Sequence, residues 1–283
     1  MADDRKRGGV LVTGATGGIG AATVRALAER GYQVFAGVRG EPGALAKTPG
    51  VRVVQMDVTE PESVAAAAKQ VDRDVRDHGL RAIVNNAGVI VQGPLELVPV
   101  EELRRQFEVN TLGPVYVTQA FLPLIRAGQG RIVNVSAPTA RMPLPFLAAL
   151  SGSKAALDAI STALRLELSS WRIPVVVVEP GTTDTAIFAK AGDASRGSLA
   201  VAPPHLVELY RAHIEAVEKT TANQKPGPVD PVARAIVTAV EASSPKRRYV
   251  VGDARAIGLV TRLPAGLRDR LVMRTFGLAG VTP

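Results

Sequence analysis

Short apolar runs alternate with longer stretches in which apolar residues recur every three or four positions. The short runs predict strands buried on both faces, and the longer stretches predict helices that cover them. The predicted strands are residues 10–13, 33–38, 51–56, 82–84, 131–135, 175–178 and 248–251. The predicted helices are residues 19–30, 59–78, 101–127 in two pieces, 153–171, a helix from about 230 and an amphipathic helix over 266–278.

Alternation of strands and helices predicts an α/β fold, a single-domain doubly wound parallel sheet of about seven strands with helices on both faces. Gly31 is expected to end the first helix, and Thr59-Glu60-Pro61-Glu62 resembles a capping box that starts the second. The regular alternation of strands and helices stops at about 182–228, where one helix is expected over 205–220. We interpret this insertion as a substrate lid and residues 254–283 as a C-terminal helical extension of one domain, 1–283.

Composition removes several classes of function. The 283 residues include no cysteine, which excludes disulfides, zinc–thiolate sites and a cysteine nucleophile. The net charge is +8, but the basic residues are mostly scattered and aromatics are only 4%. We therefore expect a solvated basic surface and no nucleic-acid partner. No charge-free run of 18 apolar residues and no signal-peptide core is present, so we expect no membrane partner and a cytoplasmic location. No carboxylate pair or histidine cluster points to a metal.

A glycine-rich turn is the first chemical motif. Residues 14–20, Gly-Ala-Thr-Gly-Gly-Ile-Gly, lie between the first predicted strand and the first predicted helix. Glycines let the backbone approach a pyrophosphate, and the helix start offers free N–H groups to the anion. In this context the turn favours a dinucleotide over a purely structural role.

The ordered motifs identify a family resemblance. Residues 13–20 resemble the T-G-x-x-x-G-x-G motif of the short-chain dehydrogenase/reductase family, and residues 85–88 its N-N-A-G motif. Asn110 resembles the family's active-site Asn, Ser136 its catalytic Ser, Lys154 its active-site Lys, and residues 180–185 its P-G-x-x-x-T stretch. The matches run in order from about residue 10 to residue 185. They imply a Rossmann fold and an NAD(P)-dependent oxidoreductase.

The resemblance assigns roles to individual positions. The turn is expected to cradle the pyrophosphate, Asp57 and Val58 to flank the adenine, and residues 86–88 to line the adenosine ribose. Lys154 is expected to bind the nicotinamide ribose, and the 180–185 stretch the carboxamide. The implied cofactor-binding residues are Gly14, Thr16, Gly18, Ile19, Gly20, Asp57, Val58, Asn86, Ala87, Gly88, Lys154, Pro180, Gly181 and Thr185.

The end of the second predicted strand determines the expected cofactor. An acidic residue there would bond a free 2′-hydroxyl and repel a 2′-phosphate. This chain has Val38 instead, followed by Arg39, whose guanidinium can bind a 2′-phosphate. We therefore expect NADP(H) to be preferred over NAD(H).

The sequence departs from the family at one catalytic position. In the family a Tyr four residues before the Lys donates the proton that accompanies hydride transfer, and here that position is Leu150. Loss of a general acid costs about 10²- to 10⁴-fold in rate. Four explanations remain open. In the first, Thr139, Ser151 or Tyr210 replaces the hydroxyl, and in the second the substrate needs no acid. In the third, the reaction is a non-redox cyclisation, elimination or isomerisation, and in the fourth the protein only binds its ligand.

An apolar substrate pocket is expected next to these residues. The stretch 142–147 is apolar and lies between Ser136 and Lys154, so we expect a hydrophobic substrate. The predicted catalytic positions are Asn110, Ser136, Lys154 and Leu150; the predicted substrate contacts are Ser136, Met142, Phe146, Leu150 and Tyr210. The favoured function is NADP(H)-dependent reduction of an apolar carbonyl, enone or imine. The family resemblance also implies a homodimer or homotetramer through helices 101–127 and 153–171.

Overall fold

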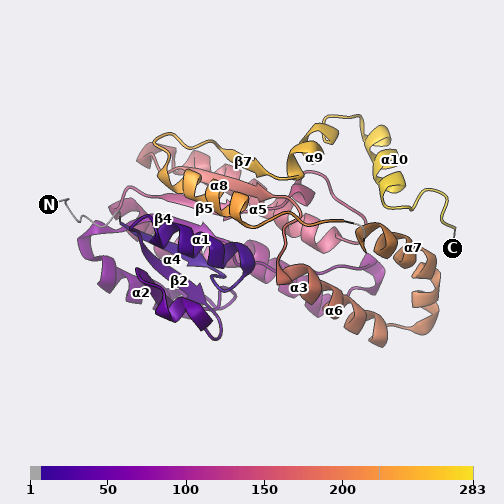
Figure 1. Cartoon of the computed structure of the whole chain (residues 1–283), viewed down its shortest axis with the longest axis horizontal. Helices are drawn as coiled ribbons and strands as arrows, with labels where there is room; N and C mark the ends of the chain where they lie inside the picture. Colours follow the sequence, from indigo (N-terminus) through magenta and orange to yellow (C-terminus); the bar gives the residue numbers. More distant parts are fainter. Residues whose placement is uncertain (1–7, 223, 283) are drawn as a thin grey trace.

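Seven parallel strands form one sheet with helices on both faces, so the predicted α/β Rossmann fold is confirmed (Figure 1). The computed structural model describes residues 8–222 and 224–282, without the side chain of Asp77. The strand order is β3-β2-β1-β4-β5-β6-β7. The strands are β1 Gly9–Thr13, β2 Gln33–Val38, β3 Val51–Gln55, β4 Leu80–Asn85, β5 Arg131–Val135, β6 Val175–Pro180 and β7 Arg248–Val251.

Helices follow most of the strands. They are α1 Gly18–Ala28, α2 Pro61–Val75, α3 Val100–Phe107, α4 Gly113–Ala127, α5 Ala148–Glu167, α6 Ala186–Val201, α7 Pro204–Ala222, α8 Asp230–Glu241, α9 Ala254–Val260 and α10 Ala265–Thr275. The two-piece helix predicted over 101–127 is confirmed, because a π-helical turn over Glu108–Leu112 joins α3 to α4. Gly31 follows α1 with a φ of 83°, a conformation that favours glycine over residues with a side chain.

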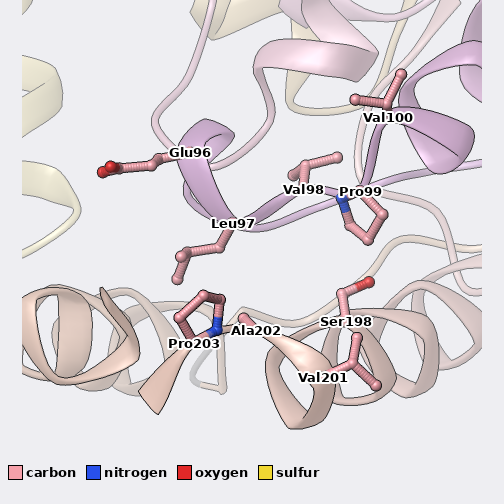
Figure 2. Close-up of a pocket in the computed structure, with 9 residues that line it drawn as sticks. All are labelled: Glu96, Leu97, Val98, Pro99, Val100, Ser198, Val201, Ala202 and Pro203. Carbon is pink, nitrogen blue, oxygen red and sulfur yellow. The ribbon is translucent and has the colours of Figure 1, made fainter. Parts of the chain in front are cut away.

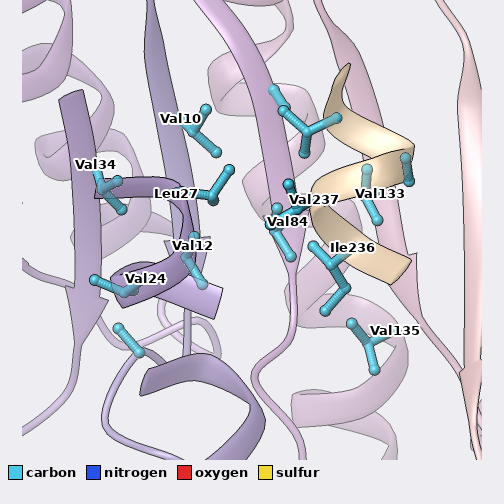
Figure 3. Close-up of a cluster of buried hydrophobic side chains, with 14 of the residues drawn as sticks. Val10, Val12, Val24, Leu27, Val34, Val84, Val133, Val135, Ile236 and Val237 are labelled. Atoms are coloured by element: carbon cyan, nitrogen blue, oxygen red, sulfur yellow. The ribbon is translucent and has the colours of Figure 1, made fainter. Parts of the chain in front are cut away.

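The core has one apolar layer on each face of the sheet. Val10 and Val12 of β1 pack with α1 and α8 in one layer (Figure 3), while Leu11 packs with α2 and α4 in the other. Successive side chains of a strand point to opposite faces, so strands of continuous Val and Ile feed both layers. This explains why the apolar runs in the sequence had no polar alternation.

Three sequence predictions need correction. The capping box at 59–62 does not form: Glu60 is the N-cap of α2 without a side-chain bond, and Thr59 instead donates its N–H and hydroxyl to Asp57 Oδ1 at 3.0 and 2.8 Å. The segment predicted to be a lid contains two helices, α6 as well as α7, where only 205–220 was expected to be helical. The C-terminal helix predicted over 266–278 is present as α10, but a further helix, α9, precedes it. The domain predicted over 1–283 also includes residues 1–7, 223 and 283, which lie outside the described residues.

Candidate active site

The glycine-rich turn lies where the sheet order reverses, between β1 and its neighbour β4. In doubly wound sheets, ligands bind at the carboxyl ends of the strands at this switch point. Gly14 has a φ of 60°, and a Cβ on it would come within 2.7 Å of Ala87 Cα. A Cβ on Gly20 would overlap the carbonyl oxygen of Gly14 and come within 2.8 Å of Asn86 Nδ2. The turn after β1 and the turn after β4 therefore pack directly together, with no room for side chains.

Asn86 and Thr13 hold these two turns in register. Asn86 Nδ2 donates to the carbonyls of Thr13 and Gly14 at 2.9 and 3.2 Å. The Thr13 hydroxyl accepts the backbone N–H groups of Asn86 and Ala87, both at 3.0 Å. The sequence predicts Asn86 beside the adenosine ribose; in the structure its amide bonds one turn to the other.

Three residues predicted at the adenosine end, Arg39, Asp57 and Val58, differ in their exposure and in their contacts within the protein. Arg39 is exposed after β2 and has no hydrogen bond or ion pair with any residue that the structure describes. Its guanidinium is thus available to an anion. Asp57 is half-buried, and its Oδ1 already accepts both bonds from Thr59. Val58 is buried against Gly113.

Lys154 lies in a buried, water-poor position on α5. Its Nζ donates to the carbonyl of Val135, the last residue of β5, at 2.8 Å. A Cβ built on Gly88 would be 3.8 Å from the same Nζ, so the amine lies next to the turn after β4. Burial lowers the pKa of Lys154 to about 8, although the negative charge of Asp158 acts in the opposite direction.

This lowered pKa predicts how stability varies with pH. Between pH about 8 and 10.5 the unfolded chain binds a proton at Lys154 that the folded chain does not, so the unfolding free energy rises with pH, in total by about 3 kcal/mol. Lys154→Met removes this contribution. The free-energy advantage of the variant over the wild type should be about 3 kcal/mol larger at pH 7 than at pH 10.5, measured by urea unfolding. Lys190→Met, at an exposed lysine, should show no such difference, and an equal pH dependence in both variants would contradict the assignment.

Asn110 and Gln106 clamp the segment that follows the second turn. Asn110 accepts the N–H of Val89 at 2.9 Å and donates to its carbonyl at 2.9 Å. Gln106, one helical turn earlier and fully buried, accepts the N–H of Val91 at 2.6 Å and donates to the carbonyl of Val89. Gln106 was not singled out in the sequence. Its position four residues before Asn110, on the same helix face, was the available signal.

Ser136 and Leu150, the other predicted catalytic positions, are both buried. The Ser136 hydroxyl has no hydrogen-bond partner in the described chain, and its oxygen is enclosed. The next residue, Ala137, has extended backbone (φ −152°, ψ 156°) and is half-buried. Because successive side chains of extended chain point in opposite directions, Ala137 faces away from the enclosed Ser136 side. The candidate replacement hydroxyls Thr139 and Ser151 are also buried and without a partner in the described chain.

Leu150 packs against α6. It is 7% exposed in a small apolar cluster with Ile90 and with Ala191 of α6, and Leu147 and Ile187 pack against this cluster. The sequence predicted an apolar residue at the edge of a substrate pocket. The structure adds that helix α6, about forty residues later in the chain, covers it.

The start of α6 adjoins the glycine-rich turn. A Cβ on Gly18 would come within 2.6 Å of the Thr185 methyl group, so the N-cap residue of α6 contacts the residue that starts α1. The two ends of segment 182–228 meet at a bridge between Thr183 and Gly227. The Gly227 N–H donates to the Thr182 carbonyl at 2.9 Å, and the Asp184 N–H donates to the Gly227 carbonyl at 2.8 Å.

The remaining predicted substrate contacts lie in different surroundings. Met142 is buried, and Phe146 is half-buried with a φ of 62°, its carbonyl accepting the Gly93 N–H at 2.8 Å. Tyr210 of α7 donates to Glu96 Oε2 at 2.9 Å at the surface and so does not take the place of a tyrosine beside Lys154.

A hollow of about 250 Å³ opens beside Glu96, at the junction between the end of α6 and the start of α7 (Figure 2). Figure 2 shows Leu97 and Val100 on one side and Val201 and Pro203 on the other. In the described part of the chain, no His, Asp and Glu side chains group as metal ligands, and no helix has the length and apolarity to cross a membrane.

Comparison with known proteins identifies the family of this chain. Residues 9–196 match the short chain dehydrogenase family. The chain belongs to this family. It is an oxidoreductase of the NAD(P)-binding Rossmann type. Among its relatives, mouse (Mus musculus) estradiol 17-beta-dehydrogenase 2 is 34% identical over 94% of this chain and 74% of that protein. The NADPH-dependent 3-dehydrocapnine reductase of Ornithobacterium rhinotracheale is 36% identical over 87% of this chain and 88% of that protein.

A solved structure of the family has the same fold. The short chain dehydrogenase from Burkholderia cenocepacia J2315, in complex with NADP, superposes with a TM-score of 0.72 and is 29% identical, covering 93% of this chain and 97% of that one. A second, from Streptomyces avermitilis, has a TM-score of 0.74 at 26% identity and covers 97% and 98%.

Proposed function

We propose that this short-chain dehydrogenase is an NADP(H)-dependent reductase of an apolar carbonyl, enone or imine whose hydride transfer is not assisted by a tyrosine. The observation that carries the proposal is Leu150: it lies one turn before Lys154 beside an intact cradle, and it is enclosed by apolar side chains. The turns pack this closely only because Gly14, Gly18 and Gly20 have no Cβ, which would meet atoms of neighbouring residues within 3 Å.

The positions of these residues give each of them a separate role in the proposed reaction. When bound, the nicotinamide supplies a hydride to an electrophilic carbon of the substrate. The Lys154 ammonium stabilises negative charge nearby, and Asn110 and Gln106 fix the wall that carries Ile90. No hydroxyl at position 150 can donate the accompanying proton. A conjugated enone can take it from solvent later, and an iminium ion needs none, so these substrates suit the site better than a simple ketone.

Arg39 supports the choice of NADP(H). It is exposed and unpaired in the described chain at the end of β2, and the relative from Ornithobacterium rhinotracheale is named as NADPH-dependent. Arg39→Ala should weaken NADPH binding about tenfold, because one charge-assisted contact to the 2′-phosphate is lost, and leave NADH binding unchanged. Isothermal titration with both cofactors measures this. Arg52→Ala, which removes an exposed charge paired with Asp74, is the matched control. Tighter NADH than NADPH binding by the wild type would reject the preference.

The direct test of function is NADPH oxidation in the presence of apolar enones, cyclic imines and ketones. We expect turnover with the first two classes and little with the third. NADPH binding without oxidation by any of them would instead support the non-redox or binding alternative, which the enclosure of Leu150 also permits.

We also propose that the substrate lid spans residues 182–228 and that residues 254–283 form a C-terminal extension. The enzyme is proposed to act as a homodimer or homotetramer in which α4 and α5 pack against their copies. Leu166 near the end of α5 and Trp171 just beyond it are 70% and 56% exposed, as expected for an uncovered apolar surface.

A further inference from the structure

Asp253, between β7 and α9, turns its carboxylate back onto the turn that follows β6. Its Oδ1 accepts the backbone N–H of Thr182 at 2.9 Å. Asp253 is also the N-cap residue of α9, but its side chain makes no capping bond to that helix. The carboxylate of an N-cap aspartate commonly bonds its own helix. Here it bonds a turn 71 residues earlier in the chain.

The contact between Asp253 and this turn leaves no room for a larger residue. A Cβ on Gly181 would overlap Asp253 Oδ1 and come within 3.0 Å of the Ala254 backbone nitrogen. The Gly181 N–H donates to the carbonyl of Val251 at 2.9 Å. Residues 181 and 182 are therefore held from one side by the end of β7 and by the carboxylate that follows it.

The same turn begins the lid. The Thr182 carbonyl accepts the Gly227 N–H, which joins the start of the lid to its end. The Thr182 N–H thus donates to Asp253, and the Thr182 carbonyl accepts the Gly227 N–H. Through this one residue, the C-terminal extension is connected to both ends of the lid.

We propose that Asp253 is a positioning residue that fixes the Gly181-Thr182 turn, and with it the nicotinamide end of the cofactor site and the base of the lid. This inference rests on the proposed NADP(H) function. Asp253 acts through Thr182 rather than by touching the reacting atoms. We therefore expect loss of the Asp253 carboxylate to loosen the nicotinamide end of the cofactor site and to leave the adenosine end, at Arg39 and Asp57, intact.

The test compares the whole cofactor with its adenosine half. Asp253→Ala should weaken NADPH binding about fivefold to tenfold, because an exposed charge-assisted hydrogen bond is lost, and leave the affinity for adenosine 2′,5′-bisphosphate unchanged. Asp253→Asn, which keeps an oxygen acceptor, should bind NADPH within about twofold of the wild type. In the cofactor-free protein, hydrogen exchange of the Thr182–Asp184 amides should accelerate in the alanine variant and not in the asparagine variant.

Asp269→Ala is the matched control, because it removes an exposed aspartate of α10 far along the extension. It should change neither binding nor exchange. Equal losses for NADPH and for the bisphosphate in Asp253→Ala, or wild-type affinity and exchange in that variant, would overturn the inference. Failure of the wild type to bind either ligand would instead overturn the proposed cofactor function.

Discussion

Replacing Leu150 by tyrosine is expected to raise NADPH-dependent reduction of apolar ketones about 10²-fold, if proton transfer limits the rate. Position 150 lies one helical turn before Lys154, so the two side chains are on the same face of α5. The Lys154 ammonium would lower the pKa of a neighbouring phenol and favour proton donation. The measurement is NADPH oxidation with a panel of ketones, wild type against variant.

The wider site determines how large this gain can be. Leu150 is enclosed by Ile90 and Ala191, so a phenol must displace α6, at a cost of about 1–3 kcal/mol of overpacking. The Ser136 hydroxyl is enclosed, while Ala137 points the other way and is half-buried. We therefore expect Leu150→Tyr combined with Ala137→Ser to exceed the single variant, because a hydroxyl at 137 can share in binding the substrate oxygen.

Leu147→Tyr is the matched control for added bulk and an added phenol. Leu147 packs in the same cluster but lies seven residues before Lys154, two turns away rather than one. It should give no gain. If neither the single nor the double variant gains ketone reduction while NADPH affinity is unchanged, the missing acid is not what limits the site, and a non-redox reaction becomes the better interpretation.

Gly20→Ala is expected to abolish measurable NADPH binding, a loss of at least about 10²-fold, and to lower the unfolding free energy by about 2 kcal/mol. The added methyl group would overlap the Gly14 carbonyl oxygen and press on Asn86 Nδ2 and Ala15 Cα. The turn must open, which breaks the two bonds from Asn86 that hold it against the turn after β4. Cofactor titration and urea unfolding measure the two effects.

Gly40→Ala is the control for this substitution, because no atom lies within 4 Å of the Cβ it would add. It should leave both quantities within experimental error of the wild type. Wild-type NADPH affinity in Gly20→Ala would mean that the switch-point turn is not the pyrophosphate cradle.

The sequence alone determined the sheet and the glycine-rich turn, because both depend on local patterns. Short apolar runs predicted all seven strands, with β2, β5 and β7 placed at the residues the structure gives. The spacing of Gly14, Gly18 and Gly20 between a strand and a helix predicted the turn. Position 150 was recognised by its distance along one helix from Lys154.

Helix α6 was missed because its sequence has almost no amphipathic signal. Of its sixteen residues only Ala191 is buried, and Gly192 and Gly197 lie within it. Its alanines favour a helix, but what holds it is packing against Ile90 and Leu150, which are distant in sequence. The capping box at residues 59–62 failed for a different, local reason, since the Asp57 carboxylate two residues earlier accepts the Thr59 hydroxyl.

Only the tertiary structure decided how the site is enclosed. That Leu150 is covered by a helix about forty residues later, that Asn86 and Gln106 are used to fix backbone, and that Asp253 bonds Thr182 all depend on contacts between distant segments. Sequence periodicity reports which face of an element is buried, and carries no information on which distant segment buries it. Local sequence patterns therefore determined the sheet and the glycine-rich turn, and contacts between distant segments determined which side chains are already bonded or enclosed within the protein.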